Sequence, residues 1–317
     1  MALPSNTVTS YIAIGQREDL SDDIFRIDPT DTPFFTMCEK TKATGVVHEW
    51  QTQALAAVDS TNQVLEGDDA TTDAQTASVR LTNICQISDK VVRVSGTVQS
   101  VETAGRDDEL AYQETLKGLE LRRDMETMLC GTNIAKDAGS ASVTRKSATV
   151  LSWIGTNDDI GTGSAASPSA LLGANTRTDG TTRAFTEVQL KNSLQLIWTS
   201  GGKPDVISLG AFNKQVMSTF TGRAQQTEDT AKKSIIAVVD SYVSDFGKIS
   251  CVANRFQRSR DALIYQSDMW AIPFLRKMVS IPLAVTGDST RRQVLSEYTL
   301  ECRNEKANGG VFDLTVS

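Results

Sequence analysis

A long β-prone stretch at residues 79–94 constrains the fold of this chain more than any other feature. It is rich in the β-branched residues that favour strands, and a second β-prone run at residues 46–52 precedes it. At roughly 3.3 Å per residue, an extended chain of the longer run's length reaches about 50 Å. One small domain cannot cover such a strand. We therefore predict a long β-loop that projects from the body of the protein.

The segment that joins the two runs is acidic. Residues 43–79 contain no Lys or Arg, whereas Glu66, Asp68 and Asp69 lie close together within them, followed by Asp73. A calcium loop is one interpretation of these acids, but the EF-hand spacing and its closing Glu are absent. The favoured interpretation is a solvated acidic tip, or a tip that meets a basic neighbour.

Composition predicts a folded protein and argues against two classes of partner. The chain has 317 residues, of which 39% are hydrophobic, enough to bury a core in one large or two modest domains. A net charge of -7 argues against wrapping nucleic acid, because binding phosphates needs clustered Lys and Arg. The N-terminus lacks the pattern of a signal peptide, and the longest strongly apolar run, residues 235–239, is too short for a bilayer. We expect no membrane partner.

Catalytic and metal-binding chemistry has little support in the sequence. His48 is the one histidine, and histidine is the commonest general acid/base and metal ligand. The run His48-Glu49-Trp50 lacks the HExxH pattern, so we interpret it as residues on alternate faces of a strand. The five cysteines are scattered without a CxxC pair, which is typical of buried thiols in a reducing compartment. We expect no cofactor and no metal.

The clearest helix signal follows the β-loop. Asp107-Asp108-Glu109 places negative charge where a helix N-terminus favours it, strong helix formers follow, and Gly131 is a natural stop. This pattern predicts a helix over residues 107–130. Arg122 and Glu126 are spaced as an i,i+4 ion pair on it. Gly118 inside the helix is either a mild weak point or a close-packing site.

The remaining chain predicts an extended arm and a mixed α/β part. Residues 1–42 are interrupted by prolines and form an arm with a short helix around 18–25. Residues 138–183 form irregular loops around one buried strand or turn at 150–154, with a linker as the alternative. Thr186 and Gln189 make a capping box that starts a helix ending near 198. Further elements are expected as strands at 205–209 and 262–266, a helix that buries Phe212, Val216 and Phe220, a hairpin of residues 235–243 and 248–254, and a turn at Asn308-Gly309-Gly310 into a last strand at 311–316.

The order of these elements, together with short motifs along the chain, resembles a known family. The motifs are Glu18-Asp19-Leu20-Ser21-Asp22, residues 27–34, His48-Glu49-Trp50-Gln51-Thr52, residues 177–183, Thr286-Gly287-Asp288-Ser289 and residues 300–305. Over its whole length the chain is similar to tailed-bacteriophage major capsid proteins with the Hong Kong 97-type fold, in a family formerly catalogued as a domain of unknown function.

The resemblance implies an α+β fold with five parts and no catalytic residues. Residues 1–42 would form the N-terminal arm and 43–95 the E-loop. Residues 96–184 would form the first part of the P-domain, with its spine helix at 107–130. Residues 185–278 would be mainly the A-domain, and 279–317 the closing strands of the P-domain.

The resemblance also implies a function in the virion. The chain would self-assemble, in the host cytoplasm, into the hexamers and pentamers of an icosahedral head. Expected partners are further copies of the chain, a separate scaffolding protein, a portal, optionally a cement protein, and packaged double-stranded DNA bound without sequence specificity. We expect no cleaved N-terminal scaffold segment. The alternatives are an encapsulin-like nanocompartment shell protein of the same fold, a carboxylate-based hydrolase and a β-rich surface-binding protein.

Charge segregation indicates where neighbouring subunits meet. In the resembled fold, the E-loop lies over the P-domain of the next subunit. The acids near the loop tip are therefore our candidates on one side, and arginines are the candidates on the other, with the spine-helix pair preferred. The candidates are Glu66, Asp68 and Asp69 on the loop, and Arg122, Arg123, Arg291 and Arg292 on the neighbour. A DNA site is one interpretation of a further basic group, but ordinary surface or inter-subunit pairing is favoured because the chain is acidic and lacks interleaved aromatic residues. The group contains Arg255, Arg258 and Arg260, with Arg276, Lys277, Arg291 and Arg292.

Overall fold

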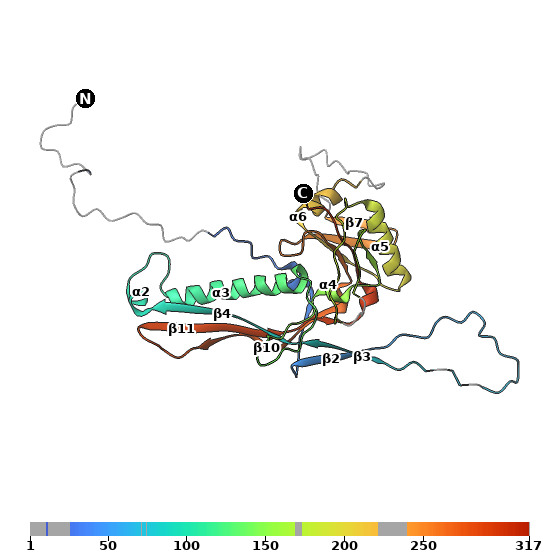
Figure 1. The fold of residues 1–317 in the computed structure, drawn as a ribbon, viewed down its shortest axis with the longest axis horizontal. Helices are drawn as coiled ribbons and strands as arrows, with labels where there is room; N and C mark the ends of the chain where they lie inside the picture. Colours follow the sequence, from blue (N-terminus) through green and yellow to red (C-terminus); the bar gives the residue numbers. More distant parts are fainter. Residues whose placement is uncertain are drawn as a thin grey trace, which may run out of the picture.

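The protein is elongated, with a two-part body and one projecting hairpin (Figure 1). The computed structural model describes residue 11 and residues 26–70, 72–73, 75–168, 173–220 and 240–316. The helix predicted at 18–25 lies outside these residues. Within them, none of the helices has the length and apolar character needed to cross a membrane.

A five-stranded sheet and a long helix form one part of the body. Along the sheet the strand order is β1, β10, β11 and β4, and a short strand, β12, also pairs with β10. β1 runs parallel to β10, and the other neighbours are antiparallel. Helix α3 lies along β4 and β11 (Figure 1). The elements are β1 (Glu39–Lys42), β4 (Gln86–Ser95), α2 (Gly96–Ser100), α3 (Glu109–Glu126), β10 (Trp270–Pro282), β11 (Ser289–Tyr298) and β12 (Glu301–Cys302).

The N-terminus of α3 agrees with the sequence prediction, whereas its C-terminus differs from it. The acids predicted at the N-terminus are there, and Asp108 also caps it by accepting a hydrogen bond from Ala111 N at 3.1 Å. At the other end the helix continues as one π turn, η1 (Thr127–Gly131). Gly131 does not have the positive φ of a left-handed cap. A Cβ there would lie 2.2 Å from the Phe256 carbonyl oxygen, so close packing is what requires glycine.

The β-prone stretch at residues 79–94 is not one strand, which corrects our prediction. It forms β3 (Val79–Ile84), which pairs with β2 (Val47–Thr52), and then β4 in the other sheet. The chain passes from one sheet to the other at Cys85, and buried amide side chains on both sides of Cys85 hold it in place. Asn83 Nδ2 donates to the Leu300 carbonyl at 2.6 Å, and Gln86 Oε1 accepts from Ser147 N at 3.2 Å. Strand propensity alone cannot reveal such anchors.

A six-stranded sheet with two helices forms the other part of the body. Its order is β5-β13-β9-β6-β8-β7. The predicted capping box is present, since both the Thr186 and the Gln189 hydrogen bonds are formed. The predicted hairpin is confirmed as β7 and β8, and residues 235–239 lie outside the described residues. The elements are β5 (Asp158–Asp159), α5 (Glu187–Thr199), β6 (Val206–Leu209), α6 (Ala211–Met217), β7 (Ser241–Ser244), β8 (Gly247–Ala253), β9 (Ala262–Tyr265) and β13 (Gly309–Val311).

Of three further local predictions, one needs correction. The expected turn at Gly309 and Gly310 is instead the start of β13. A Cβ at these positions would lie 2.4 Å from the Asn157 oxygen and 2.8 Å from the Ala262 oxygen, so the glycines admit neighbouring backbone. Val216 and Phe220 pack against the core as predicted, but the fully buried residues of α6 are Asn213, which donates to the Ser259 carbonyl, and Met217. The segment predicted as a buried strand or turn at 150–154 is a buried helical turn, α4 (Val150–Trp153).

Two hydrophobic clusters form the core. One joins the end of α3 to the five-stranded sheet and contains Trp153, Trp270 and Phe312. It also buries Phe34 from a short helix of the arm, α1 (Pro33–Met37). The second cluster lies between α5 and the six-stranded sheet. The described residues also form the 3-10 turns η3 (Ser267–Met269) and η4 (Glu305–Ala307).

Candidate inter-subunit surfaces

The β2–β3 hairpin is held to the body at its base. His48 Nε2 lies 2.9 Å from Glu301 Oε2, and Trp50 Nε1 donates to the Cys302 carbonyl at 2.9 Å. Burial acts to raise the pKa of Glu301, but hydrogen bonds from His48 and Arg303 hold that pKa below its ordinary value. His48 and Trp50 face inward while Glu49 faces outward, which confirms the alternate-face interpretation of this motif.

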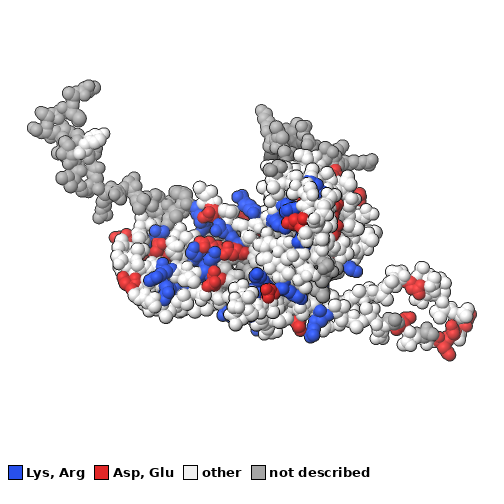
Figure 2. Space-filling model, viewed as in Figure 1, with Lys and Arg blue, Asp and Glu red and all other residues white. Residues whose placement is uncertain are grey.

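Beyond this base, the loop of residues 53–78 is exposed at every described position. Its described part carries Asp and Glu side chains and no Lys or Arg (Figure 2). Four large apolar side chains of the loop are between 77% and 99% exposed: Leu55, Val58, Val64 and Leu65. Exposed apolar side chains gathered in one segment mark a surface that meets another molecule. Glu66, Asp68 and Asp69 are exposed beside them.

The two candidate arginines of α3 differ in their surroundings. The Arg122 guanidinium lies 5.4 Å from the centre of the Phe35 ring, and its Nη2 donates to Thr32 Oγ1 at 3.4 Å. Arg122 is therefore engaged with the arm of its own subunit. The Arg123 side chain is half-buried and makes no hydrogen bond or ion pair within the described ranges. The Arg123 guanidinium is therefore the more available of the two for contact with another molecule.

Arg291 and Arg292 point to opposite faces of the five-stranded sheet. Arg292 Nη1 lies 3.2 Å from Glu114 Oε2 on α3, so Arg292 lies on the helix-covered face. Successive side chains of a strand alternate, which places Arg291 on the other face. There it lies directly opposite Arg93 of β4. Sequence reasoning did not single out Arg93, because only the register of β4 and β11 brings it to this position.

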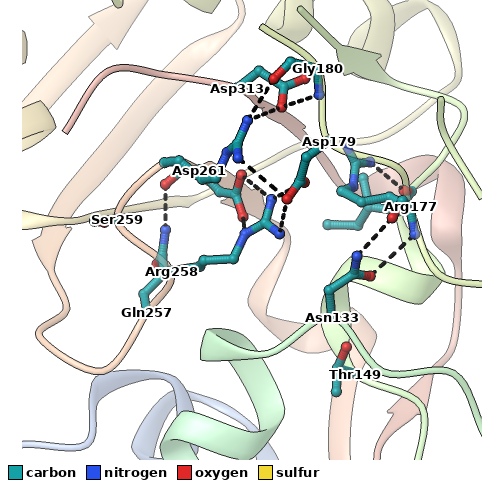
Figure 3. A network of polar contacts seen from close by, with 12 residues as sticks. Asn133, Thr149, Arg177, Asp179, Gly180, Gln257, Arg258, Ser259, Asp261 and Asp313 are labelled. Carbon is teal, nitrogen blue, oxygen red and sulfur yellow. Dashed lines mark hydrogen bonds and ion pairs between the residues drawn. The ribbon is translucent and has the colours of Figure 1, made fainter. Parts of the chain in front are cut away.

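Arg258 and Arg260 form ion pairs with carboxylates of the same subunit, in the network that Figure 3 shows. Arg258 Nη2 lies 2.7 Å from Asp179 Oδ1, and Arg258 Nε lies 2.6 Å from Asp261 Oδ2. Arg260 Nη2 lies 2.7 Å from Asp313 Oδ1. Arg258 and Arg260 are therefore paired with carboxylates of their own subunit, which is neither the inter-subunit pairing nor the DNA site that the sequence analysis considered.

The arm is attached to α3 through a buried carboxylate. Glu126 accepts hydrogen bonds from Phe34 N at 2.9 Å and from Phe35 N at 2.6 Å, so it binds the first amides of α1. Burial raises the pKa of Glu126. The ion pair predicted from the i,i+4 spacing with Arg122 is wrong, because Glu126 faces the core and Arg122 faces the Phe35 ring.

Solved structures with this arrangement are phage capsids. A structure from Gordonia phage Cozz matches with a TM-score of 0.62 and 10% identity, covering 95% of this chain and 92% of that chain. The mature capsid of bacteriophage PhiM1 matches with a TM-score of 0.58 and 9% identity, covering 96% and 98%. The major capsid and decoration proteins of phage G give a TM-score of 0.53 and 10% identity over 99% and 100%. The chain therefore has the predicted α+β fold of the Hong Kong 97 type.

Sequence similarity gives the particular family. The family model described as SU10 major capsid protein matches residues 3–315, and the chain belongs to this family. The major capsid protein of Escherichia phage Phieco32 is 27% identical over 351 residues, covering 98% of each chain. The predicted function, a tailed-phage major capsid protein of the virion, is thereby confirmed at the level of the family.

Proposed function

We propose that this chain assembles into the hexamers and pentamers of an icosahedral head that encloses double-stranded DNA, and that assembly takes place in the host cytoplasm. The exposed loop of residues 53–78 carries this proposal, because its apolar side chains have no cover in the isolated subunit. Stable interfaces between subunits bury on the order of 1,200–2,000 Å² or more. A projecting hairpin supplies such area without enlarging the body.

We propose the five-part division of the chain as stated from the resemblance. Residues 1–42 are the arm, 43–95 the E-loop, 96–184 the first part of the P-domain, 185–278 mainly the A-domain, and 279–317 the closing strands. The position of α3 along β4 and β11 supports a spine helix that stiffens the P-domain. The last part of the E-loop range, β4, then belongs to the sheet under that helix.

The proposed partners are further copies of the chain, a separate scaffolding protein and a portal. A cement protein is also proposed, since the matched phage G structure contains decoration proteins. Between copies, the loop acids Glu66, Asp68 and Asp69 face basic residues drawn from Arg122, Arg123, Arg291 and Arg292. Packaged DNA meets a net acidic chain and is bound without sequence specificity. The proposal assigns the chain no catalytic role.

Electron microscopy of particles purified after expression with the other head proteins of its phage tests this function. We expect closed icosahedral shells that protect DNA from nuclease when packaging is complete. Particles that enclose protein cargo and no DNA would favour a nanocompartment instead. Chains that stay monomeric with every head protein present would contradict the proposal.

A further inference from the structure

The β2–β3 hairpin pairs with no other strand in the described part of the chain, so its attachment to the body depends on side-chain contacts. Two of these contacts join β2 to β12. Trp50 Nε1 donates to the Cys302 carbonyl at 2.9 Å, a contact between neutral groups. His48 Nε2 lies 2.9 Å from Glu301 Oε2. The second contact can gain or lose a charge under mild conditions, because histidine titrates between about pH 5 and 8.

His48 lies at the end of a row of alternating charges. Glu301 Oε1 accepts a hydrogen bond from Arg303 Nε at 3.2 Å, and Arg303 Nη2 lies 2.6 Å from Glu39 Oε2 on β1. The two carboxylates and the one guanidinium leave one negative charge in excess unless the imidazole is protonated. The His48 and Glu301 side chains are only 15% and 12% exposed, so water and salt screen this excess poorly. A proton on His48 therefore balances the row.

The stacking of His48 on Trp50 also favours the protonated ring. The two ring centroids are 5.6 Å apart, and the ring planes are inclined by 30°. A cation over the face of an indole ring is attracted by the negative charge of that face. Trp50 in turn lies 5.4 Å from the ring of Trp153, which belongs to the core. Protonation of His48 thus strengthens its contact with β12 and its contact with the tryptophan that anchors β2.

Two other charged contacts lie near the base of the hairpin. Glu49 and Arg80 pair at 3.3 Å on the outward face. Lys136 Nζ donates to the Thr82 carbonyl of β3 at 2.9 Å. Both contacts remain when His48 alone is replaced, so a comparison of chains that differ only at His48 isolates the imidazole.

We propose that the His48–Glu301 pair makes the attachment of the hairpin sensitive to pH. The base of the hairpin is held firmly to β12 while His48 is protonated, and less firmly once His48 is neutral. A contact that favours the protonated form is present at low pH and is lost as pH rises through the range in which histidine titrates. Asn83 and Trp50 keep their neutral contacts throughout, so the pair adjusts how often the base opens and does not release the hairpin.

Hydrogen exchange of the β2 and β3 amides in the full-length, unassembled chain measures how often the base opens. The comparison variant is His48→Gln, because glutamine offers a neutral N–H donor and does not titrate. Dividing the wild-type rate by the variant rate removes the ordinary dependence of exchange on pH. We expect this ratio to rise about fivefold between about pH 5.5 and pH 7.5, since a charge-assisted hydrogen bond is about twice as strong as a neutral one. A ratio that stays constant or falls overturns the proposal.

The Glu301→Gln variant is the matched control, because it keeps a hydrogen-bond acceptor and removes the charge. Dividing its exchange rate by that of Glu301→Gln/His48→Gln should give a ratio that rises less than about twofold over the same range. An equal rise in both backgrounds would show that His48 acts without Glu301, which also overturns the proposal. If a variant fails to fold, the wild type alone decides. Its β2 and β3 amides should lose protection relative to the amides of α5 as pH rises, and equal changes in both would contradict the proposal.

Discussion

Glu126 Oε1 accepts a hydrogen bond from the Asn254 side-chain amide at 2.6 Å, although 128 residues separate the two in the chain. The bond links the end of α3 to the segment that follows β8. Since the same carboxylate binds the first amides of α1, the arm, the spine helix and the six-stranded part of the body meet at one buried group. Glu126 has no cationic partner among the described residues, so neutral donors alone hold its oxygens.

Replacing Glu126 by Ala should strongly destabilise the subunit. The change leaves Phe34 N, Phe35 N and the Asn254 amide without their acceptor in a buried site. Each unsatisfied buried donor costs about 1–3 kcal/mol, so we expect a loss of at least about 3 kcal/mol. Urea denaturation of the unassembled subunit at neutral pH measures the change. A loss below about 1 kcal/mol would show that water or a local shift replaces the carboxylate.

The Glu126→Gln variant isolates the titration of this group. Burial raises the pKa of Glu126 in the folded state. Its protonated form therefore contributes stability that is fully present below the unfolded pKa, about 4.3, and is lost as pH rises through the folded value. Between these values, the unfolding free energy of the wild type minus that of the variant should decrease with rising pH. An increase over the same range would mean that the hydrogen bonds outweigh burial and that the pKa is lowered.

Asp313 should show the opposite pH dependence. Burial acts to raise its pKa, but hydrogen bonds from Gly161 N, Gly180 N and Arg260 outweigh burial and lower that pKa. Its contribution is therefore present above the unfolded pKa, about 3.9, and is lost as pH falls through the lower folded value. Asp313→Asn keeps a residue type that tolerates the positive φ of 60°. We expect the variant to lose about 1–3 kcal/mol at neutral pH and to show a flatter decline in acid.

A measurement of unfolding free energy against pH, between pH 3 and pH 7 in the same buffer series, checks this prediction. An Asp313→Asn curve parallel to that of the wild type would show that the carboxylate does not titrate differently on folding. In that case the role assigned to the Gly161 and Gly180 amides would be wrong.

Two glycines near α3 should respond to alanine in opposite ways. A Cβ at Gly118 would meet Met278 Sδ at an ordinary 3.8 Å, so Gly118→Ala should stabilise the helix by about 0.5–1 kcal/mol. At Gly131 the Cβ would collide with the Phe256 carbonyl oxygen, and Gly131→Ala should destabilise by more than 1 kcal/mol. Thermal unfolding of both unassembled variants gives the two signs, and equal signs would refute the packing argument. If Gly118→Ala stabilises the subunit yet blocks assembly, a neighbouring subunit covers that position.

Local signals in the sequence predicted much of the fold. The capping box at Thr186 and Gln189 and the cap at Asp108 each depend on residues a few positions apart, so the sequence shows them directly. The glycines of β13 were misread as a turn because their neighbours, Asn157 and Ala262, are distant in the chain. When backbone from a distant part of the chain packs closely against a residue, the sequence around that residue shows no pattern that reveals the contact.

The candidate interface depends even more on long-range register. Arg291 and Arg292 are adjacent in sequence, yet they lie on opposite faces of the sheet. Arg292 contacts Glu114 on the face that α3 covers, whereas Arg291 lies opposite Arg93 on the other face. Similarly, Arg258 and Arg260 form a basic group in the sequence but meet Asp179, Asp261 and Asp313 in the fold. The acidic loop was predictable because it is one continuous segment. The position of Arg93 opposite Arg291 was not, since it depends on the register of β4 and β11.

Cryo-electron microscopy of assembled shells, at a resolution that traces side chains, tests the central claim most directly. The account predicts a closed icosahedral shell in which the loop of residues 53–78 leaves its own subunit and buries Leu55, Val58, Val64 and Leu65 against a neighbouring copy. A shell whose loops fold back on their own subunits, or project freely into solvent, would contradict the claim that this hairpin joins the subunits.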